Sequence, residues 1–349
     1  MTTFLVTVTL IALWVALFPL AGRIANKDRR EAAEAYLYLA PAGLLLLAFW
    51  FVPVAFSVFI SLTDWASGSN FSTVKWVGFA QYAKAWSDPG FWSSLWNTLN
   101  YVVYSVPLTI GASLAVALAL NNPLVKGRGA LRTLYFLPYV TTWVAISIVF
   151  KYVFNEQFGL ANGLLEAGGF PTLGWLGESR GIWEMAFGVG AGAPPGSAPP
   201  HALLAGPSLS MFTIIMTSVW RDTGYFMVIF LAGLQNIDRS YYEAAEIDGA
   251  GPWQRFRHVT LPLLGPTTLF VSIIALITAF KVFVPQYVMT PGGGPGKTTA
   301  TLVYYVYELG FQGEFNLAYA SAVAYILFFI ILALTRVQDA VFGRKVHYD

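Results

Sequence analysis

The sequence predicts an all-α polytopic membrane protein. Of its 349 residues, 56% are hydrophobic and only 11% are charged, whereas a typical soluble domain carries about 25% charged residues. The mean hydropathy is +0.60. Seven apolar stretches approach the ~20 residues that a spanning helix needs. They are residues 3–20, 36–60, 95–120, 131–154, 208–232, 266–289 and 317–336.

Basic residues in the connecting loops predict how these spans are oriented. One set of loops holds thirteen Lys and Arg residues, whereas the opposite set holds four, with Lys151 near the end of a span. Because cytoplasmic loops are enriched in Lys and Arg, the first set is predicted to lie inside the cell, the N-terminus outside and the C-terminus inside. The thirteen are Arg23, Lys27, Arg29, Arg30, Lys126, Arg128, Arg132, Arg239, Arg255, Arg257, Arg336, Arg344 and Lys345.

The N-terminal apolar stretch differs from a secretory signal. Its basic residues follow the apolar run, whereas those of a signal precede it, so we predict that residues 1–20 are retained as a helix. Residues 22–35 are predicted to form a short basic helix at the inner membrane surface. Residues 1–35 would then be an additional span and linker, followed by a six-helix core over 36–340 and a cytoplasmic tail over 341–349.

A polar stretch between the fifth and sixth apolar runs is predicted to hold a short helix. Ser240 and Glu243 have the spacing of a capping box, so the helix is expected to start at Ser240. Gly249, Gly251 and Pro252 are expected to end it, because glycine enters the left-handed region cheaply and proline cannot continue a helix. About nine residues are too few for a helix that is stable alone in water. We therefore expect another molecule to hold it.

The residues of this stretch resemble the EAA loop of ABC-transporter import permeases. Glu-Ala-Ala at 243–245 is followed by Gly249 and, after nine intervening residues, by Val-x-Leu-Pro at 259–262. The flanks resemble the carbohydrate branch of the family, the maltose- and glycerol-phosphate-type permeases, and Val259 departs from the usual isoleucine. In that family the loop, here residues 238–262, is a coupling helix that docks in a cleft of a separate ATPase. The resemblance assigns this coupling to Glu243, Ala244, Ala245, Asp248 and Gly249.

The resemblance covers about residues 36–340 and implies a type I ABC importer transmembrane domain. Such a permease would move a sugar, oligosaccharide or polyol across the cytoplasmic membrane of a bacterium or archaeon by alternating access. The implied partners are a second permease, two cytoplasmic ATPase subunits that bind ATP and Mg²⁺, an extracytoplasmic solute-binding protein and membrane lipid. With a net charge of +2, no cysteine and three scattered histidines, the chain is expected to bind no nucleic acid, metal or cofactor itself.

Three charged residues lie within the predicted spans: Arg221 and Asp222 in the fifth, and Lys281 in the sixth. A charge at the bilayer centre costs about 2.5–3.5 kcal/mol on insertion scales, so such residues face a cavity or a partner. Because consecutive helix residues do not face each other, Arg221 and Asp222 are expected to need partners on other spans, or water. Two interpretations stay open. The charges form a buried ion pair that fixes helix packing, or they line a sugar pathway with Trp220 and Tyr225 as stacking surfaces.

Residues 292–298 resemble a Walker A phosphate loop, but the first glycine of that motif falls on Pro291, which has no amide to donate. We therefore expect no ATPase site on this chain and no enzymatic activity. A membrane enzyme would need a catalytic set such as paired aspartates or His-Glu-x-x-His, and neither is found. The remaining alternative is an ion-coupled secondary transporter, which would need no ATPase.

Overall fold

The computed structural model describes residue 14 and residues 26–66, 73–122, 124–188, 205–313 and 315–342. This part of the chain is helical, and its extended pairing is confined to two isolated bridges, Thr63 with Trp76 and Gly181 with Ser208. It contains five helices long and apolar enough to cross a membrane, or six when a bent pair counts as one span. The predicted all-α polytopic fold is confirmed. The predicted span at 3–20 lies, apart from Trp14, outside the described residues, so the count of seven spans stays a prediction.

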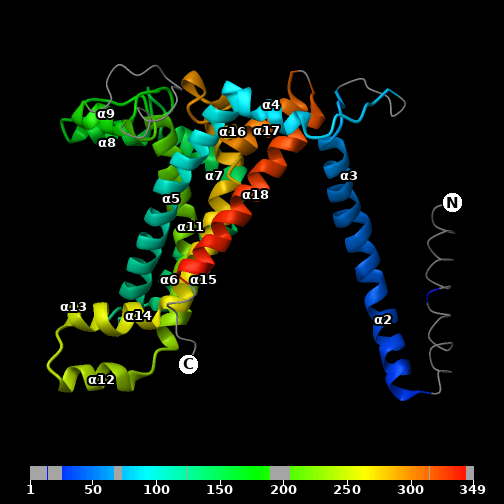
Figure 1. Ribbon diagram of the computed structural model, residues 1–349. Coiled ribbons are helices and arrows are strands. Elements are labelled where there is room, and N and C mark those ends of the chain that lie inside the picture. Colours follow the sequence, from blue (N-terminus) through cyan, green and yellow to red (C-terminus); the bar gives the residue numbers. More distant parts are fainter. Residues whose placement is uncertain are drawn as a thin grey trace, which may run out of the picture.

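The six described spans follow the apolar runs of the sequence (Figure 1). In chain order they are α2 (Lys27–Leu46) continued by the π-turn η1 (Leu47–Phe51) and α3 (Val52–Ser61), α5 (Pro89–Asn121), the pair α6 (Arg128–Val140) and α7 (Trp143–Val153), α11 (Leu209–Gln235), α15 (Gly265–Phe280) with α16 (Val284–Met289), and α18 (Leu317–Phe342).

The first described span stands apart from the other helices (Figure 1). The separate basic helix predicted over 22–35 is wrong, because the helix that starts at Lys27 runs without interruption into the membrane-spanning run. Asn26 caps its start by accepting a hydrogen bond from Arg29 N, and Arg30 pairs with Glu34 one turn on. No residue of α2 is buried, whereas α3 packs against α18. A long apolar surface is therefore left for lipid or another subunit.

The fourth span is not the single straight helix that residues 131–154 predicted. α6 and α7 meet at an angle of 98°, because Thr141 and Thr142 both adopt extended backbone angles, with ψ of 143° and 142°. The Thr142 hydroxyl accepts a hydrogen bond from Ala145 N and thereby caps the start of α7. The break thus has its own local cause in the sequence.

The core of the bundle is built around α11, which packs along α5 and against α6. One apolar cluster, with Met211, Ile214 and Phe280 at its centre, joins α5, α11 and α15 to α17 (Leu302–Phe311) and α18. A second cluster fills the other half of the bundle around Met227 and Phe230. Burial of this apolar surface between helices positions α11, and with it the charged residues that α11 carries.

The short helices gather at the two ends of the bundle (Figure 1). α4 (Ala80–Ser87), α8 (Leu160–Ala167), α9 (Ile182–Phe187) and α17 lie at one end. The turns η3 (Pro291–Gly293) and η4 (Pro295–Lys297) connect α16 to α17 at that end, and Lys297 pairs there with Glu308. α12 (Arg239–Ile247), α13 (Pro252–Arg255), η2 (Phe256–Thr260) and α14 (Leu261–Leu263) lie at the opposite end. The two ends correspond to the two predicted sets of loops.

The carboxylate of Asp88 links three helices at the end of the bundle opposite α12. Asp88 Oδ1 accepts the Gly90 amide at 2.8 Å and caps α5, while its Oδ2 accepts hydrogen bonds from the hydroxyls of Tyr305 and Tyr319. Partial burial raises the pKa of Asp88, but the two tyrosine hydroxyls and the backbone amides outweigh it and hold this pKa below its ordinary value. Asp88 thereby joins α5 to α17 and α18.

We expect Asp88→Asn to lower the free energy of unfolding by about 2 kcal/mol, because a helix cap and two charge-assisted hydrogen bonds are weakened. Because the folded pKa lies below the unfolded value of about 3.9, the stabilisation is complete at neutral pH and is lost as the pH falls through the folded pKa. Thermal unfolding of the detergent-solubilised protein measures both effects. Equal stability of Asp88→Asn and the parent protein at pH 7 would contradict this role.

The predicted orientation can be measured directly, because the sequence contains no cysteine. Ser87 and Ser240 are both exposed and lie at opposite ends of the bundle. In spheroplasts, a membrane-impermeant maleimide should label Ser87→Cys, whereas it should label Ser240→Cys only after permeabilisation. Labelling of Ser240→Cys in sealed spheroplasts would reverse the orientation.

Candidate functional site

The polar stretch 238–262 forms two short helices at one end of the bundle. α12 begins at Arg239, and its cap is Asp238, whose Oδ1 accepts the Ser240 amide at 2.8 Å. The cap predicted at Ser240 is therefore wrong by two residues, because Asp is as good an N-cap as Ser and precedes it in the chain. This backbone hydrogen bond also lowers the pKa of Asp238. The helix is nine residues long, as predicted.

Gly249 ends α12 in the left-handed region, with φ of +79°. Gly251 and Pro252 begin α13 instead of ending α12, since proline is favoured in the first turn of a helix. A Cβ added at Gly249 would have no atom of this chain within 4 Å. Its backbone angle, and not crowding inside the chain, therefore requires glycine at this position.

α12 projects from the bundle with no buried residue (Figure 1). Two side-chain contacts attach it: Tyr242 Oη lies 3.0 Å from Thr260 Oγ1, and Glu246 pairs with Arg255 at 3.3 Å. The side chain of Ile247 is 87% exposed. Of the five residues assigned to coupling, Ala245 is half-buried and the other four are exposed. The helix thus offers a surface that this chain leaves uncovered.

Apolar side chains at this surface were not among the predicted site residues. Ile247 on α12 and Trp253 on α13 are both largely exposed, and Tyr241 adds a third exposed ring. Large apolar residues within a polar, charged loop are the sequence signal that would have indicated them.

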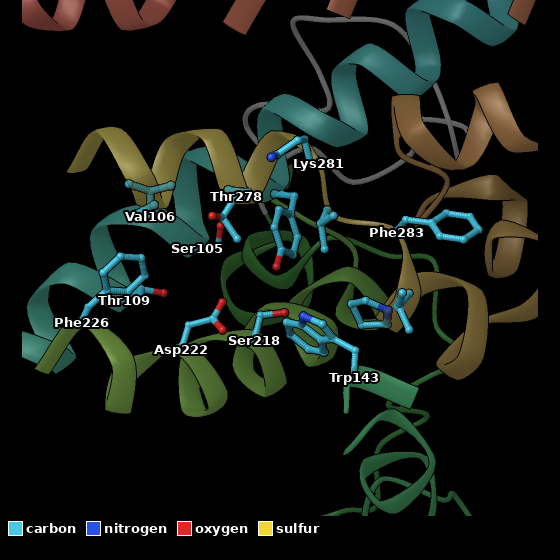
Figure 2. A pocket seen from close by; sticks show the side chains of 16 residues that line it. Ser105, Val106, Thr109, Trp143, Ser218, Asp222, Phe226, Thr278, Lys281 and Phe283 are labelled. Atoms are coloured by element: carbon cyan, nitrogen blue, oxygen red, sulfur yellow. The ribbon is translucent and has the colours of Figure 1, made fainter. Parts of the chain in front are cut away.

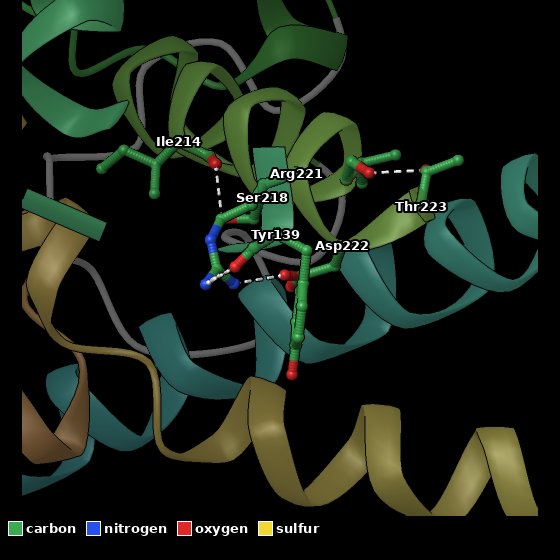
Figure 3. A network of polar contacts seen from close by, with 7 residues as sticks. Tyr139, Ile214, Ser218, Arg221, Asp222 and Thr223 are labelled. Atoms are coloured by element: carbon green, nitrogen blue, oxygen red, sulfur yellow. Dashed lines mark hydrogen bonds and ion pairs between the residues drawn. The ribbon is translucent and has the colours of Figure 1, made fainter. Parts of the chain in front are cut away.

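Arg221 and Asp222 pair with each other inside the bundle (Figure 3). Arg221 Nη1 lies 2.8 Å from Asp222 Oδ1, and both residues are only 9% exposed. The expectation that these neighbours need separate partners on other spans is wrong for this pair. The long arginine side chain curls around the helix and reaches the adjacent carboxylate, so the different directions of the two Cβ atoms do not keep the charges apart.

The same arginine supports the bend between α6 and α7. Arg221 Nη2 donates a hydrogen bond to the carbonyl oxygen of Tyr139 at 3.0 Å (Figure 3). The guanidinium also lies over two rings, 4.7 Å from the Tyr139 centroid and 4.2 Å from that of Trp143. Gly224 of α11 permits the close approach of α6, since a Cβ at this position would fall 1.8 Å from Tyr135 O. These contacts favour the structural interpretation of Arg221.

A pocket of about 200 Å³ lies between α5, α11 and the end of α15 (Figure 2). Asp222 and Lys281 line it, as the pathway interpretation expects. Trp220, Arg221 and Tyr225 do not: Trp220 packs on Phe150, and Tyr225 stacks on Tyr139 with ring centroids 4.4 Å apart. The other hydrogen-bonding side chains of the pocket are Tyr101, Ser105, Thr109, Trp143, Ser218 and Thr278.

The contribution of α5 to this pocket was missed in the sequence. Tyr101, Ser105 and Thr109 recur at intervals of four residues and so lie on one face of the helix. All three are buried, and Ser105 Oγ has no hydrogen-bond partner within the described residues. This spacing is a signal that would have identified the α5 wall of the pocket.

Lys281 occupies the break between α15 and α16, where it caps the C-terminal end of α15. The negative pole of a helix favours a cation by about 0.3–1 kcal/mol. The Lys281 side chain is exposed in this chain. Lys281 forms no ion pair with any described residue. Its ammonium is therefore free to contact water in the pocket or an anion from outside the described chain.

A helical membrane bundle with an internal polar pocket and a projecting helix at one end is the architecture of a transport protein. The family model described as "Binding-protein-dependent transport system inner membrane component" matches residues 108–347. The chain belongs to this family, the membrane-spanning permeases of ABC importers, as the resemblance of residues 238–262 to the EAA loop had indicated.

Individual relatives and a solved structure agree with this assignment. The chain is 36% identical over 304 residues to the lactose transport system permease protein LacF of Rhizobium radiobacter, covering 87% of this chain and 92% of LacF. It is 31% identical over 318 residues to the sulfoquinovosyl glycerol transport system permease protein SmoG of Agrobacterium fabrum, covering 91% and 93%. A bacterial ABC transporter that imports the acidic polysaccharide alginate contains a chain of the same fold, with a TM-score of 0.72, 21% identity and coverage of 91% and 98%.

Removal of one partner from the Arg221–Asp222 pair should destabilise the protein more than removal of both. We expect Arg221→Gln to cost about 3–5 kcal/mol, because it leaves a buried carboxylate uncompensated. The double variant Arg221→Gln, Asp222→Asn should recover a large part of this loss. Thermal unfolding of the single and double variants in detergent measures the coupling, and strictly additive losses would refute a mutual ion pair.

Proposed function

We propose that this permease imports a sugar, oligosaccharide or related polyol into a bacterial or archaeal cell. Support comes from the relatives, two of which are named for lactose and sulfoquinovosyl glycerol transport. The polar pocket also suits a hydroxyl-rich solute, since hydroxyl groups of α5 and α11 stand beside the ring of Trp143.

The partner subunits are proposed on the same basis. α12 would dock in a cleft of a cytoplasmic ATPase, of which two copies would bind ATP and Mg²⁺, while this chain would hold neither. The observation that carries this proposal is that α12 projects from the membrane-spanning bundle with no buried residue. A solute-binding protein would deliver the solute at the opposite end. One of the solved alginate transporter structures contains such a periplasmic protein.

A second permease subunit would complete the pathway. Ligand pockets usually enclose about 300–1,000 Å³, whereas the pocket of this chain has a volume of about 200 Å³. Between α2 and α3, Phe49 and Trp50 of η1 are also largely uncovered. The small volume of the pocket favours a pathway formed between two permeases, and the exposed face of the first described span would lie against the second permease or lipid.

The complete importer, reconstituted in proteoliposomes with its ATPases and binding protein, tests the proposal. Uptake of labelled sugar should require ATP in the vesicle lumen, where the ATPase subunits of the importing complexes lie. It should stop when vanadate in the lumen inhibits ATP hydrolysis. Uptake that continues without ATP and collapses when an uncoupler is added would instead establish the ion-coupled alternative.

Coupling through α12 can be tested at Gly249. We expect Gly249→Asp to abolish ATP-driven uptake while the protein still reaches the membrane, because a side chain there forces a strained backbone and obstructs docking. Gly313→Asp is the matched control. Gly313 also has a positive φ, of 69°, with no atom within 4 Å of an added Cβ, but it precedes α18 at the other end of the bundle. Normal transport by Gly249→Asp, or equal loss in both variants, would reject the coupling role.

A further inference from the structure

We infer that the solute carries an anionic group, such as a carboxylate, sulfonate or phosphate on a sugar, and that Lys281 binds this group. The inference rests on the proposed function, because it concerns the solute of the same pocket. Its starting point is the distribution of charge around the pocket, where one negative and one positive side chain contribute to the lining.

The negative side chain is already neutralised within the protein. Asp222 pairs with Arg221 at 2.8 Å, and Arg221 is withdrawn from the pocket toward the rings of Tyr139 and Trp143. The two charges cancel locally. Arg221 is also committed to the Tyr139 carbonyl at the bend of α6 and α7, so it is not available to bind a solute anion.

The positive side chain remains uncompensated. Lys281 and Asp222 lie on opposite sides of the pocket in Figure 2, and they form no ion pair. Lys281 differs in this respect from Lys297, which pairs with Glu308, and among the described residues it is the one cationic side chain that lines this pocket. Because the Lys281 side chain is exposed and forms no ion pair with a described residue, an anionic group on the solute can serve as its counter-charge.

Neutral hydroxyl groups surround the position that the sugar ring would take. Ser105 Oγ is buried and has no hydrogen-bond partner in the described chain. It lines the pocket together with Thr109 of α5 and with Thr278, which lies one helical turn before Lys281. A solute hydroxyl would satisfy Ser105 while its anionic group contacts Lys281. The pocket therefore combines contacts for a sugar with a single contact for a negative charge.

The proteoliposome assay tests this with a mixture of disaccharides, in which each neutral member is matched by its uronate, 6-sulfate and 6-phosphate counterparts. Uptake of each is measured by mass spectrometry. We expect the parent importer to prefer one anionic member over its neutral counterpart, and Lys281→Gln to reduce uptake of that member at least tenfold. Lys281→Arg should retain it, because the charge is kept.

Lys151→Gln is the matched control, since Lys151 is exposed at the end of α7 and does not line the pocket. It should import the anionic member at the parent rate. Selective ATP-driven uptake of neutral members would overturn the inference and leave the proposed function standing. An equal loss of neutral and anionic uptake in Lys281→Gln would also overturn it, and would indicate that Lys281 pairs with the second permease. Absence of ATP-driven uptake for every probe would reject the proposed function, and the inference with it.

Discussion

The contact of Arg221 with the bend between α6 and α7 is the interaction on which the pocket depends. A helix break within a membrane frees backbone carbonyls, and these must find partners inside the protein because lipid offers none. Arg221 donates a hydrogen bond to the carbonyl oxygen of Tyr139, and Asp222 balances the positive charge of Arg221. Trp143, the first residue after the bend, lies under the guanidinium and also lines the pocket. A pair of charges that hydropathy alone would count as a defect thus supports a pocket wall.

α11 connects this site to the projecting helix α12. It is continuous over 27 residues, carries Asp222 at its middle, and is followed after three residues by Arg239 of α12. At its inner end Gly233 lets α15 come close, since a Cβ there would fall 2.5 Å from Thr267 Oγ1. The two helices that hold Asp222 and Lys281 are therefore packed together near α12. In the proposed mechanism, a displacement imposed on α12 would move both walls of the pocket.

Sequence patterns predicted features that depend on local composition and missed those that depend on backbone direction or side-chain reach. Apolar runs located the six described spans, and Gly249 marked the end of α12. The bend at Thr141 was missed because a hydropathy average carries no information on backbone dihedral angles. No glycine or proline stands at residues 141 and 142 to mark the bend. The Arg221–Asp222 pair was missed because Cβ direction does not limit a side chain with four rotatable bonds. The cap of α12 is Asp238 instead of the predicted Ser240, because two good capping residues lie close together in the sequence.

The exposed surfaces of the chain indicate that the structure is a part of a larger assembly. Lipid can cover the apolar face of α2 and α3, and water can cover the charged residues of α12, so neither surface alone requires a protein partner. Ile247 and Trp253 lie outside the apolar spans and beside charged residues, where lipid cannot reach them if α12 extends beyond the membrane. A surface of this kind is stabilised by burial against another protein. These two apolar residues therefore support an ATPase partner more strongly than the acidic Glu243 does, because water alone would satisfy the Glu243 side chain.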